Sequence, residues 1–257
     1  MTDQKLASYP SLANRTVLVT GGGSGIGAAI VEAFARQGSK VAFLDFDQAA
    51  STALAQAVEA KTGHTPLFLP CDLRDIAALR VSIAETAATL GPISVLVNNA
   101  ASDTRHAWDT VTPDYWDERI ASNLKHVFFA AQAVQPMMAR LGGGSIINLG
   151  STSWRIGQGG MPAYTTSKSA ILGLTRSLAR DFGPANIRVN SISPGWVMTE
   201  RQKTLWLTEE GEKLIDRSQC LKRRLQPEDI ANVVLFFASD DSGVCTSQDY
   251  IADGGWV

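Results

Sequence analysis

Hydrophobic residues along the chain gather in short runs that alternate with longer stretches of mixed character. The stretches between the runs carry the apolar spacing of amphipathic helices, as in residues 28–38. Strands that are apolar throughout and joined by helices are typical of a parallel sheet covered on both faces. The sequence therefore predicts an α/β fold with one doubly wound parallel sheet. Its six clearest strand-length runs occupy residues 15–20, 40–46, 66–70, 93–99, 145–150 and 187–193.

The chain shows no sign of a division into domains. No linker, repeat or low-complexity stretch interrupts the alternation, so residues 1–257 are predicted to form a single domain. Residues 196–224 differ from the rest, because they are polar and charged, lack strand character and precede the helical pattern of 227–239. We expect this segment to cover a site rather than to join the core.

Composition and charge limit the possible partners. The 257 residues are 45% hydrophobic, and the net charge of −2 is spread over both signs, so nucleic acid is not an expected partner. Apolar stretches all fall short of eighteen residues, and the N-terminus lacks the pattern of a leader peptide, so we expect no membrane association. Three widely separated cysteines suit reduced thiols and a cytoplasmic location, and their spacing predicts no metal site.

A glycine-rich loop follows the first predicted strand. Residues 20–27 read TGGGSGIG and open into a helix, whose positive N-terminus suits a diphosphate. Asp45 ends the second predicted strand, where a carboxylate accepts both ribose hydroxyls and repels a 2′-phosphate. Basic residues are missing from the loop and from the positions just after Asp45. The pattern therefore favours NAD over NADP, although a glycine loop by itself is weak evidence and Asp45 could be a helix cap.

Tyr164 and Lys168 stand four residues apart in the sequence YTTSK. On a helix, this spacing places the ammonium beside the phenol. A neighbouring cation favours the phenolate, so we expect Lys168 to lower the pKa of Tyr164 towards the range of a working base. The pair could also be an ordinary surface contact, and its meaning depends on the residues around it.

Taken together and in order, these motifs resemble the short-chain dehydrogenase/reductase family over nearly the whole chain. The resemblance adds Asp72, the NNA at 98–100, Asn123, Ser151 thirteen residues before Tyr164, and PGWVMT at 194–199. It implies a Rossmann-type fold in which Tyr164 is the acid/base, Lys168 holds the nicotinamide ribose, Ser151 orients the substrate oxygen and Asn123 holds a relay water. One departure is Ala101, where the family usually has glycine.

The resemblance also implies a cofactor site and an assembly. We expect a homotetramer with Trp256 in a subunit contact. The cofactor-binding residues that it implies are Gly21, Ser24, Gly25, Ile26, Gly27, Asp45, Asp72, Leu73, Asn99, Tyr164, Lys168, Pro194, Gly195, Val197 and Thr199.

Within the family, the chain is most similar to bacterial NAD-dependent sugar 1-dehydrogenases of the D-xylose type. The similarity lies in residues 102–106, 153–157, 201–212 and 219–231. It implies oxidation of the anomeric hydroxyl of an aldose to a lactone. A sugar pocket needs donors, acceptors and aromatic surface. The residues predicted to provide them are His106, Ser151, Trp154, Gln158, Trp196, Arg201 and Gln202, with Arg105 as a further candidate.

Other interpretations of the same residues stay open at this stage. The Ser, Tyr and Lys set would also serve a ketoreductase of 3-oxoacyl thioesters, or a dehydrogenase of sugar acids whose carboxylate binds Arg105, Arg155 or Arg201. A nucleotide-binding regulatory protein could share the fold without turnover.

The remaining aromatic, basic and histidine residues are given structural interpretations. We expect packing from Trp108, Trp116 and Trp206, a solvated face from Arg223 and Arg224, and no catalytic role for His64 or His126.

Overall fold

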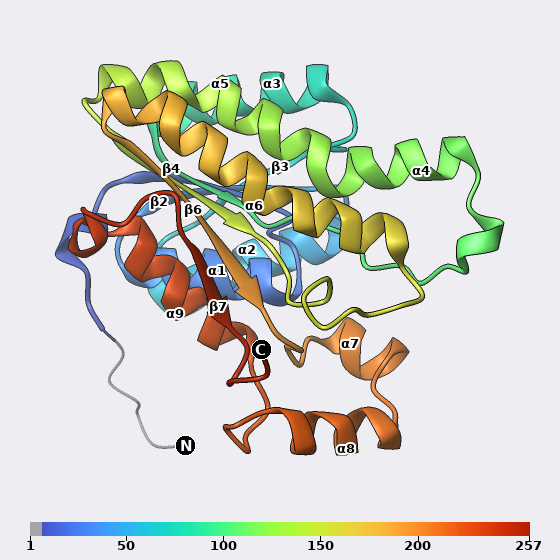
Figure 1. Cartoon of the computed structure of the whole chain (residues 1–257). Helices are drawn as coiled ribbons and strands as arrows, with labels where there is room; N and C mark the ends of the chain where they lie inside the picture. Colours follow the sequence, from blue (N-terminus) through green and yellow to red (C-terminus); the bar gives the residue numbers. More distant parts are fainter. Residues whose placement is uncertain (1–6) are drawn as a thin grey trace.

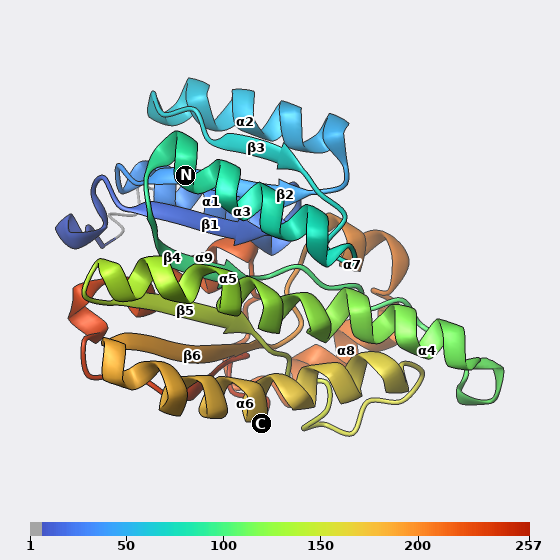
Figure 2. The ribbon, with the colours of Figure 1, turned by 90° about the horizontal axis from the view of Figure 1, so that it is seen from above.

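Among residues 7–257, which the computed structural model of the protein describes, seven strands form one parallel sheet. Residues 1–6, part of the stretch in which we found no leader pattern, lie outside the described residues. The strands lie in the order β3-β2-β1-β4-β5-β6-β7, and Figure 2 shows this order from β3 to β6. The fold class predicted from the sequence is confirmed. The strands are β1 (Thr16–Thr20), β2 (Lys40–Asp45), β3 (Leu67–Pro70), β4 (Ile93–Asn98), β5 (Gly144–Leu149), β6 (Ile187–Pro194) and β7 (Asp249–Ala252).

Helices cover both faces of the sheet (Figure 1). On one face lie α3, α5 and α6, and on the other lie α1, α2 and α9, each with a hydrophobic cluster beneath it. The helices are α1 (Gly25–Arg36), α2 (Gln48–Thr62), α3 (Ile76–Leu90), α4 (Pro113–Ile120), α5 (His126–Arg140), α6 (Pro162–Phe182), α7 (Glu200–Leu205), α8 (Glu209–Ser218) and α9 (Pro227–Ala238).

The central strands are buried on both faces, which explains their continuous apolar sequence. All five residues of β1 are buried: Val17 and Val19 join the cluster under α1 and α9, while Leu18 joins the one under α3 and α5. Helix α1 meets the sheet through one apolar face that includes Ile30 and Phe34. Because both faces of these strands are buried, they lack the alternation of apolar and polar residues that a half-exposed strand would show.

The chain changes direction across the sheet between β1 and β4. The strands β1 to β3 extend the sheet one way, and β4 returns to pair with the other side of β1. Loops that leave the carboxyl ends of β1 and β4 therefore diverge to opposite faces and leave a crevice between them. The short helices α7 and α8 lie outside the layers, in the segment 196–224 that the sequence sets apart (Figure 1).

A buried chain of amides fixes helix α6 against the sheet. The Asn98 side chain donates to Oδ1 of Asn148 at 2.9 Å, and the Asn148 side chain donates to Oγ1 of Thr175 at 2.9 Å. These bonds link β4, β5 and α6, and both asparagines are buried. Because a buried polar group is costly without a partner, these two hydrogen bonds hold α6 in one position along the sheet. They therefore also fix the position of the first turns of α6.

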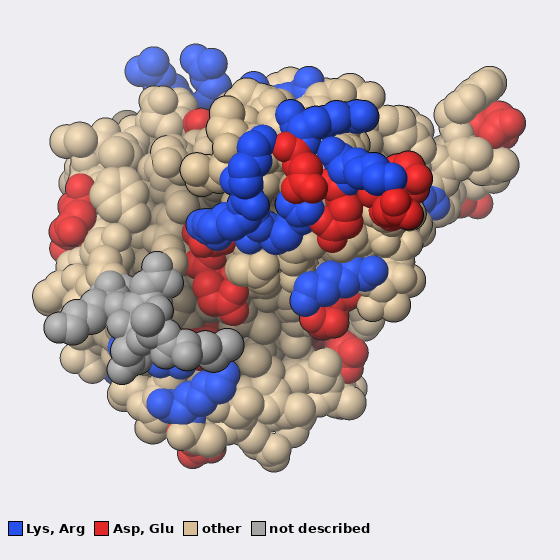
Figure 3. Space-filling view, turned by 90° about the horizontal axis from the view of Figure 1, so that it is seen from below, with Lys and Arg blue, Asp and Glu red and all other residues tan. Residues whose placement is uncertain are grey.

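Charged residues mix on the surface rather than gathering by sign. On the face seen in Figure 3, Lys and Arg side chains lie among Asp and Glu. Arg224 pairs with both Glu212 and Asp216, and Arg223 pairs with Asp229 at 2.6 Å. This face thus has the mixed charges expected from the net charge.

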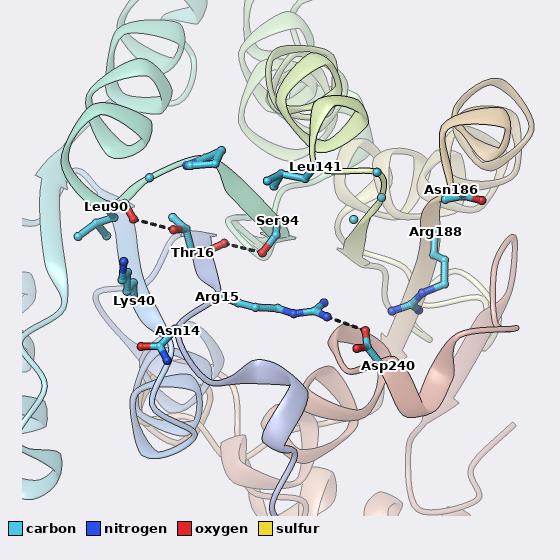
Figure 4. A pocket seen from close by; sticks show the side chains of 15 residues that line it. Asn14, Arg15, Thr16, Lys40, Leu90, Ser94, Leu141, Asn186, Arg188 and Asp240 are labelled. Atoms are coloured by element: carbon cyan, nitrogen blue, oxygen red, sulfur yellow. Dashed lines mark hydrogen bonds and ion pairs between the residues drawn. The ribbon is translucent and has the colours of Figure 1, made fainter.

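A small hollow of about 570 Å³ lies at the amino ends of the strands (Figure 4). An ion pair between Arg15 and Asp240, 2.6 Å long, closes one side, and Thr16 and Ser94 bond to nearby backbone carbonyls. The side chains predicted to be functional do not line it. The described residues contain no helix long and apolar enough to cross a membrane.

Candidate active site

A cavity of about 1380 Å³ lies at the carboxyl ends of the strands. It begins at the loop between β1 and α1, passes the end of β4, and continues to the first turns of α6 and to α7 and α8. Each of the fifteen residues predicted to bind the cofactor lines it, as do Ser151, Gln158, Trp196, Arg201 and Gln202 from the predicted substrate set.

The glycine loop has a shape that larger residues would prevent. Gly21 and Gly25 have φ of +65° and +55°, a region that favours glycine. A Cβ at Gly27 would lie 1.9 Å from the carbonyl oxygen of Gly21, and one at Gly25 would lie 3.2 Å from Cγ2 of Thr199. Ser24, the residue before α1, makes no side-chain cap bond, so the amides of the first turn face the cavity without that partner. The loop therefore fits a diphosphate at the helix N-terminus.

Asp45 lies beside this loop at the end of β2. One carboxylate oxygen accepts from the backbone N–H of Gly23 at 2.9 Å, and the other accepts from that of Asp47 at 3.1 Å. Asp45 therefore shapes the loop as well as lining the cavity, where Glu32 and Asp47 are further acids. The cap of α2 is Asp47, whose carboxylate accepts from the backbone N–H of Ala50, so Asp45 is not the helix cap that the sequence left open. Its contact with the ribose stays a prediction.

Two other loops complete the nucleotide end. The Asn99 side chain donates to the carbonyl oxygens of Thr20 and Gly21 at 3.0 and 2.8 Å, and so holds the glycine loop. Asp72 pairs with Arg74 at 2.6 Å, which holds the pKa of its carboxyl below the usual range. The exposed ring of Phe46 also lines the cavity, although no sequence motif singled it out.

Ser151, Tyr164 and Lys168 meet in the middle of the cavity. Pro162 begins α6, so Tyr164 and Lys168 lie on its first two turns. The buried Lys168 ammonium donates to the carbonyl oxygen of Leu149 at 2.6 Å and lies 5.8 Å from the centre of the Tyr164 ring. The Ser151 hydroxyl donates to Oγ of Ser153 at 3.0 Å.

The electrostatics of the pair differ from the sequence prediction. Burial raises the pKa of Tyr164 to about 12, and the nearby Ser151 hydroxyl opposes this only in part. Burial also lowers the pKa of Lys168 to about 8. The prediction that Lys168 lowers the Tyr164 pKa was wrong for the protein alone, because burial, which disfavours the charged forms of both groups, outweighs the neighbouring charges.

Asn123 lies next to the cavity rather than in it. It is buried in a π-helical segment, Ala121–Lys125, between α4 and α5. Its Oδ1 accepts from the backbone N–H of Ser102 at 2.7 Å, and its Nδ2 donates to the carbonyl oxygen of Arg119 at 2.9 Å. The side chain therefore anchors the loop that follows β4, and its role in holding a relay water stays a prediction.

Two predicted substrate residues point elsewhere. The ring of His106 bonds to the Tyr115 hydroxyl at 3.1 Å and to the backbone N–H of Ala163 at 3.3 Å, and it does not line the cavity. Trp154 is also outside the lining and lies under the guanidinium of Arg155, 4.4 Å from the ring centre. Both residues support neighbouring loops in this structure. Spacing from Ser151 cannot reveal which way a loop side chain turns.

The structure adds Asp103, which the sequence analysis did not single out. It lies in the loop after β4 and lines the cavity together with Arg105, the further candidate of the sequence analysis. The position of Asp103 just after an apolar strand was a usable signal. Trp256 also lines the cavity from the C-terminus, and its subunit contact stays a prediction. Trp108, predicted to pack, is 81% exposed. Groups of three or more metal-ligating side chains are not found among residues 7–257.

Comparison with known proteins places the site in a family context. A protein-family model described as enoyl-(acyl carrier protein) reductase, adh_short_C2, matches residues 21–257. The chain is 52% identical over 249 residues to the probable galactose dehydrogenase GalD of Rhizobium meliloti, covering 97% of each chain. It is 48% identical over 250 residues to D-xylose 1-dehydrogenase of Caulobacter vibrioides, covering 97% of this chain and 98% of that one.

Solved structures show the same fold over almost the whole chain. A protein described as a short-chain alcohol dehydrogenase from Sinorhizobium meliloti 1021 matches with a TM-score of 0.91 and 34% identity, covering 96% of this chain and 98% of that one. A blue fluorescent protein from a metagenomic library, in complex with NADPH, matches with a TM-score of 0.87 and 35% identity over 96% and 99%. The chain is thus an oxidoreductase of the short-chain dehydrogenase/reductase family, whose members act on CH–OH groups with a nicotinamide cofactor.

Proposed function

We propose that the protein oxidises the anomeric hydroxyl of a neutral aldose to the lactone with NAD as the hydride acceptor. The observation that carries the choice of a neutral substrate is the pairing of the basic residues near the site. Arg201 is bonded to Asp103 at 3.1 Å, and Arg155 to Asp249 at 2.7 Å. Arg105 lies over the Trp206 ring at 5.1 Å. Arg155 and Arg201 are thus paired with carboxylates, and the Asp103 carboxylate that lines the cavity would repel a substrate carboxylate, which counts against sugar acids.

The relatives support the same substrate class. The two that are about half identical to this chain are named for galactose and for D-xylose. The cavity end near Tyr164 combines Trp196, Gln158 and Met161 with the Asp103 carboxylate, a mixture that suits the apolar face and the hydroxyls of a pyranose.

The roles of the catalytic residues follow from their positions. In this proposal, a bound nicotinamide cofactor would supply the acceptor for the hydride that leaves C1. The Tyr164 oxygen accepts the proton of the C1 hydroxyl, and the Ser151 hydroxyl holds the same substrate oxygen. Lys168 binds the ribose, and its positive charge, with that of the oxidised ring, opposes the effect of burial on the Tyr164 pKa.

Asp45 supports NAD as the cofactor. A 2′-phosphate at the ribose would meet the Asp45 carboxylate, with Asp47 and Glu32 also lining this end of the cavity. Arg74, which lines the cavity near Asp72, is already paired with Asp72 and Glu118. This basic side chain is therefore occupied by carboxylates rather than directed at a second phosphate.

The direct test follows the absorbance of reduced nicotinamide while the enzyme meets D-xylose, L-arabinose, D-galactose, L-fucose and D-glucose, with NAD and NADP in parallel. We expect rapid NAD reduction with at least one aldose and much slower reduction of NADP. Turnover only of sugar acids or keto substrates would contradict the substrate class. NAD binding without turnover of any alcohol or carbonyl would favour a regulatory protein.

A homotetramer in the cytoplasm completes the proposal. Phe236 on α9 and Tyr250 on β7 are exposed apolar residues, and Trp108 is a third, so they offer surface for subunit contacts. The described cysteines are free, as suits a reducing compartment. Sedimentation as a monomer at micromolar concentration would contradict the tetramer.

A further inference from the structure

Asp103 joins the loop after β4 to helix α7 across the cavity. Its Oδ2 accepts from Nε2 of Gln202 at 2.6 Å, and its Oδ1 accepts from Nε of Arg201 at 3.1 Å. Arg201 also reaches Oγ1 of Thr104 at 3.5 Å. These residues are almost a hundred positions apart in the sequence, so the contacts tie two loops that leave different strands.

The two sides of this connection differ in how firmly they are held. The loop that carries Asp103 rests on buried groups, because the backbone of Ser102 donates to the buried Asn123 and the Ser102 hydroxyl accepts from Arg119 at 3.1 Å. Helix α7 has six residues. Among the described residues, its side-chain hydrogen bonds to other elements all end on Asp103 or Thr104. The position of α7 therefore depends on Asp103 more than on any other polar partner.

The neighbouring helix α8 has its own supports. Gly211 lies against the Trp196 ring, where an added Cβ would come within 3.1 Å of the ring, and Arg224 pairs with Glu212 and Asp216. The dependence on Asp103 is thus particular to α7 within the segment 196–224.

The Asp103 carboxylate has capacity left for a ligand. A carboxylate offers about four acceptor positions, and Arg201 and Gln202 use one on each oxygen. Only 15% of the side chain is exposed, and it lines the cavity whose middle holds Tyr164. Hydroxyl groups of a sugar are donors that fit such a site, whereas a substrate carboxylate would be repelled.

We propose that Asp103 is a specificity-determining residue that holds α7 over the cavity and accepts hydrogen bonds from the substrate hydroxyls remote from C1. The same carboxylate then positions α7 and binds the sugar. Substrates with several hydroxyl groups are therefore favoured over simple alcohols. The half of the proposal that concerns hydroxyls rests on the proposed function. The half that concerns α7 does not, and it is measured without substrate turnover.

The test compares Asp103→Asn with Asp109→Asn, an exposed aspartate in the same loop region. In Asp103→Asn, we expect the KM for the aldose to rise about tenfold or more, since a charged hydrogen-bond acceptor is lost, while the KM for NAD changes less than about twofold. Tryptic cleavage after Lys203 in α7, followed by mass spectrometry with NAD present, should become several times faster. Asp109→Asn should change neither quantity.

Each outcome bears on a different part of the proposal. Faster cleavage with an unchanged aldose KM would overturn the hydroxyl role, and an unchanged cleavage rate would overturn the role in holding α7. Should Asp103→Asn fail to fold, Gln202→Ala, which leaves the carboxylate in place, is expected to speed the cleavage and to raise the aldose KM less. If no aldose is oxidised, the proposed function fails, while the cleavage comparison still decides the role in α7.

Discussion

The nucleotide end and the substrate end of the cavity are built by different means. At the nucleotide end, the glycine loop, Asp45 and Asn99 lie directly on strand ends, and their bonds run largely to backbone groups. At the substrate end, α7 is held by side chains, chiefly through Asp103. The backbone of the sheet therefore positions the nucleotide end of the cavity. The shape of the substrate end depends on a few loop side chains and can change when they are substituted.

Tyr164 lies where the two ends meet, and its removal should have the largest effect. Tyr164→Phe deletes only the hydroxyl that takes the proton, so we expect kcat/KM to fall about a thousandfold, within the range for loss of an acid/base group. NAD binding, measured by protein fluorescence, should persist. Tyr115→Phe, which loses a phenol bonded to His106, is the matched control and should keep most activity. Near-normal turnover of Tyr164→Phe would remove it from the catalytic role.

Asp45→Asn would test whether the Asp45 carboxylate makes the protein prefer NAD over NADP. The amide oxygen can still accept from Gly23, but the charge that repels a 2′-phosphate is gone. We expect the preference for NAD over NADP, as the ratio of kcat/KM values, to fall about tenfold to a hundredfold, with the KM for the sugar unchanged. A preserved ratio would place the choice of cofactor elsewhere.

Arg105→Gln would test whether charge at the substrate end reaches the catalytic tyrosine. The Arg105 charge lowers the pKa of Tyr164, so its loss should raise that pKa. Because oxidation needs the phenolate, the rising limb of the kcat/KM profile should move to higher pH, by up to about one unit. Arg80→Gln, which removes an arginine stacked on Phe129 away from the cavity, should leave the profile in place. A shift to lower pH would contradict the stated sign.

His126 gives the smallest expected effect, and it concerns stability. Its ring is fully buried, and burial lowers its pKa to about 4 from about 6.5. Between about pH 6.5 and pH 4, His126 binds a proton in the unfolded chain but not in the folded chain. The free energy of unfolding therefore falls as the pH drops through this range. In His126→Gln, we expect the loss of unfolding free energy over this window to shrink by about 1–3 kcal/mol, measured by urea denaturation. The exposed His64→Gln should not change the slope.

Sequence patterns determined the sheet of this protein and most of the residues that line its larger cavity. Continuous apolar runs can be satisfied only by burial on both faces, so they predicted the central strands, and motifs at strand ends predicted the residues of the nucleotide end. The same cavity is lined by Ser151, Tyr164 and Lys168. The fold brings the end of β5 and the start of α6 together, so their proximity follows from the backbone alone.

Tertiary structure alone decided the pKa of Tyr164 and the layout of the substrate end. Burial raises that pKa, and burial depends on every element around the cavity. Asp103 meets Arg201 and Gln202, while His106 and Trp154 turn away, because loop side chains follow contacts between segments far apart in the chain. Sequence spacing fixes neighbours within one helix or strand, but it does not fix contacts across a cavity.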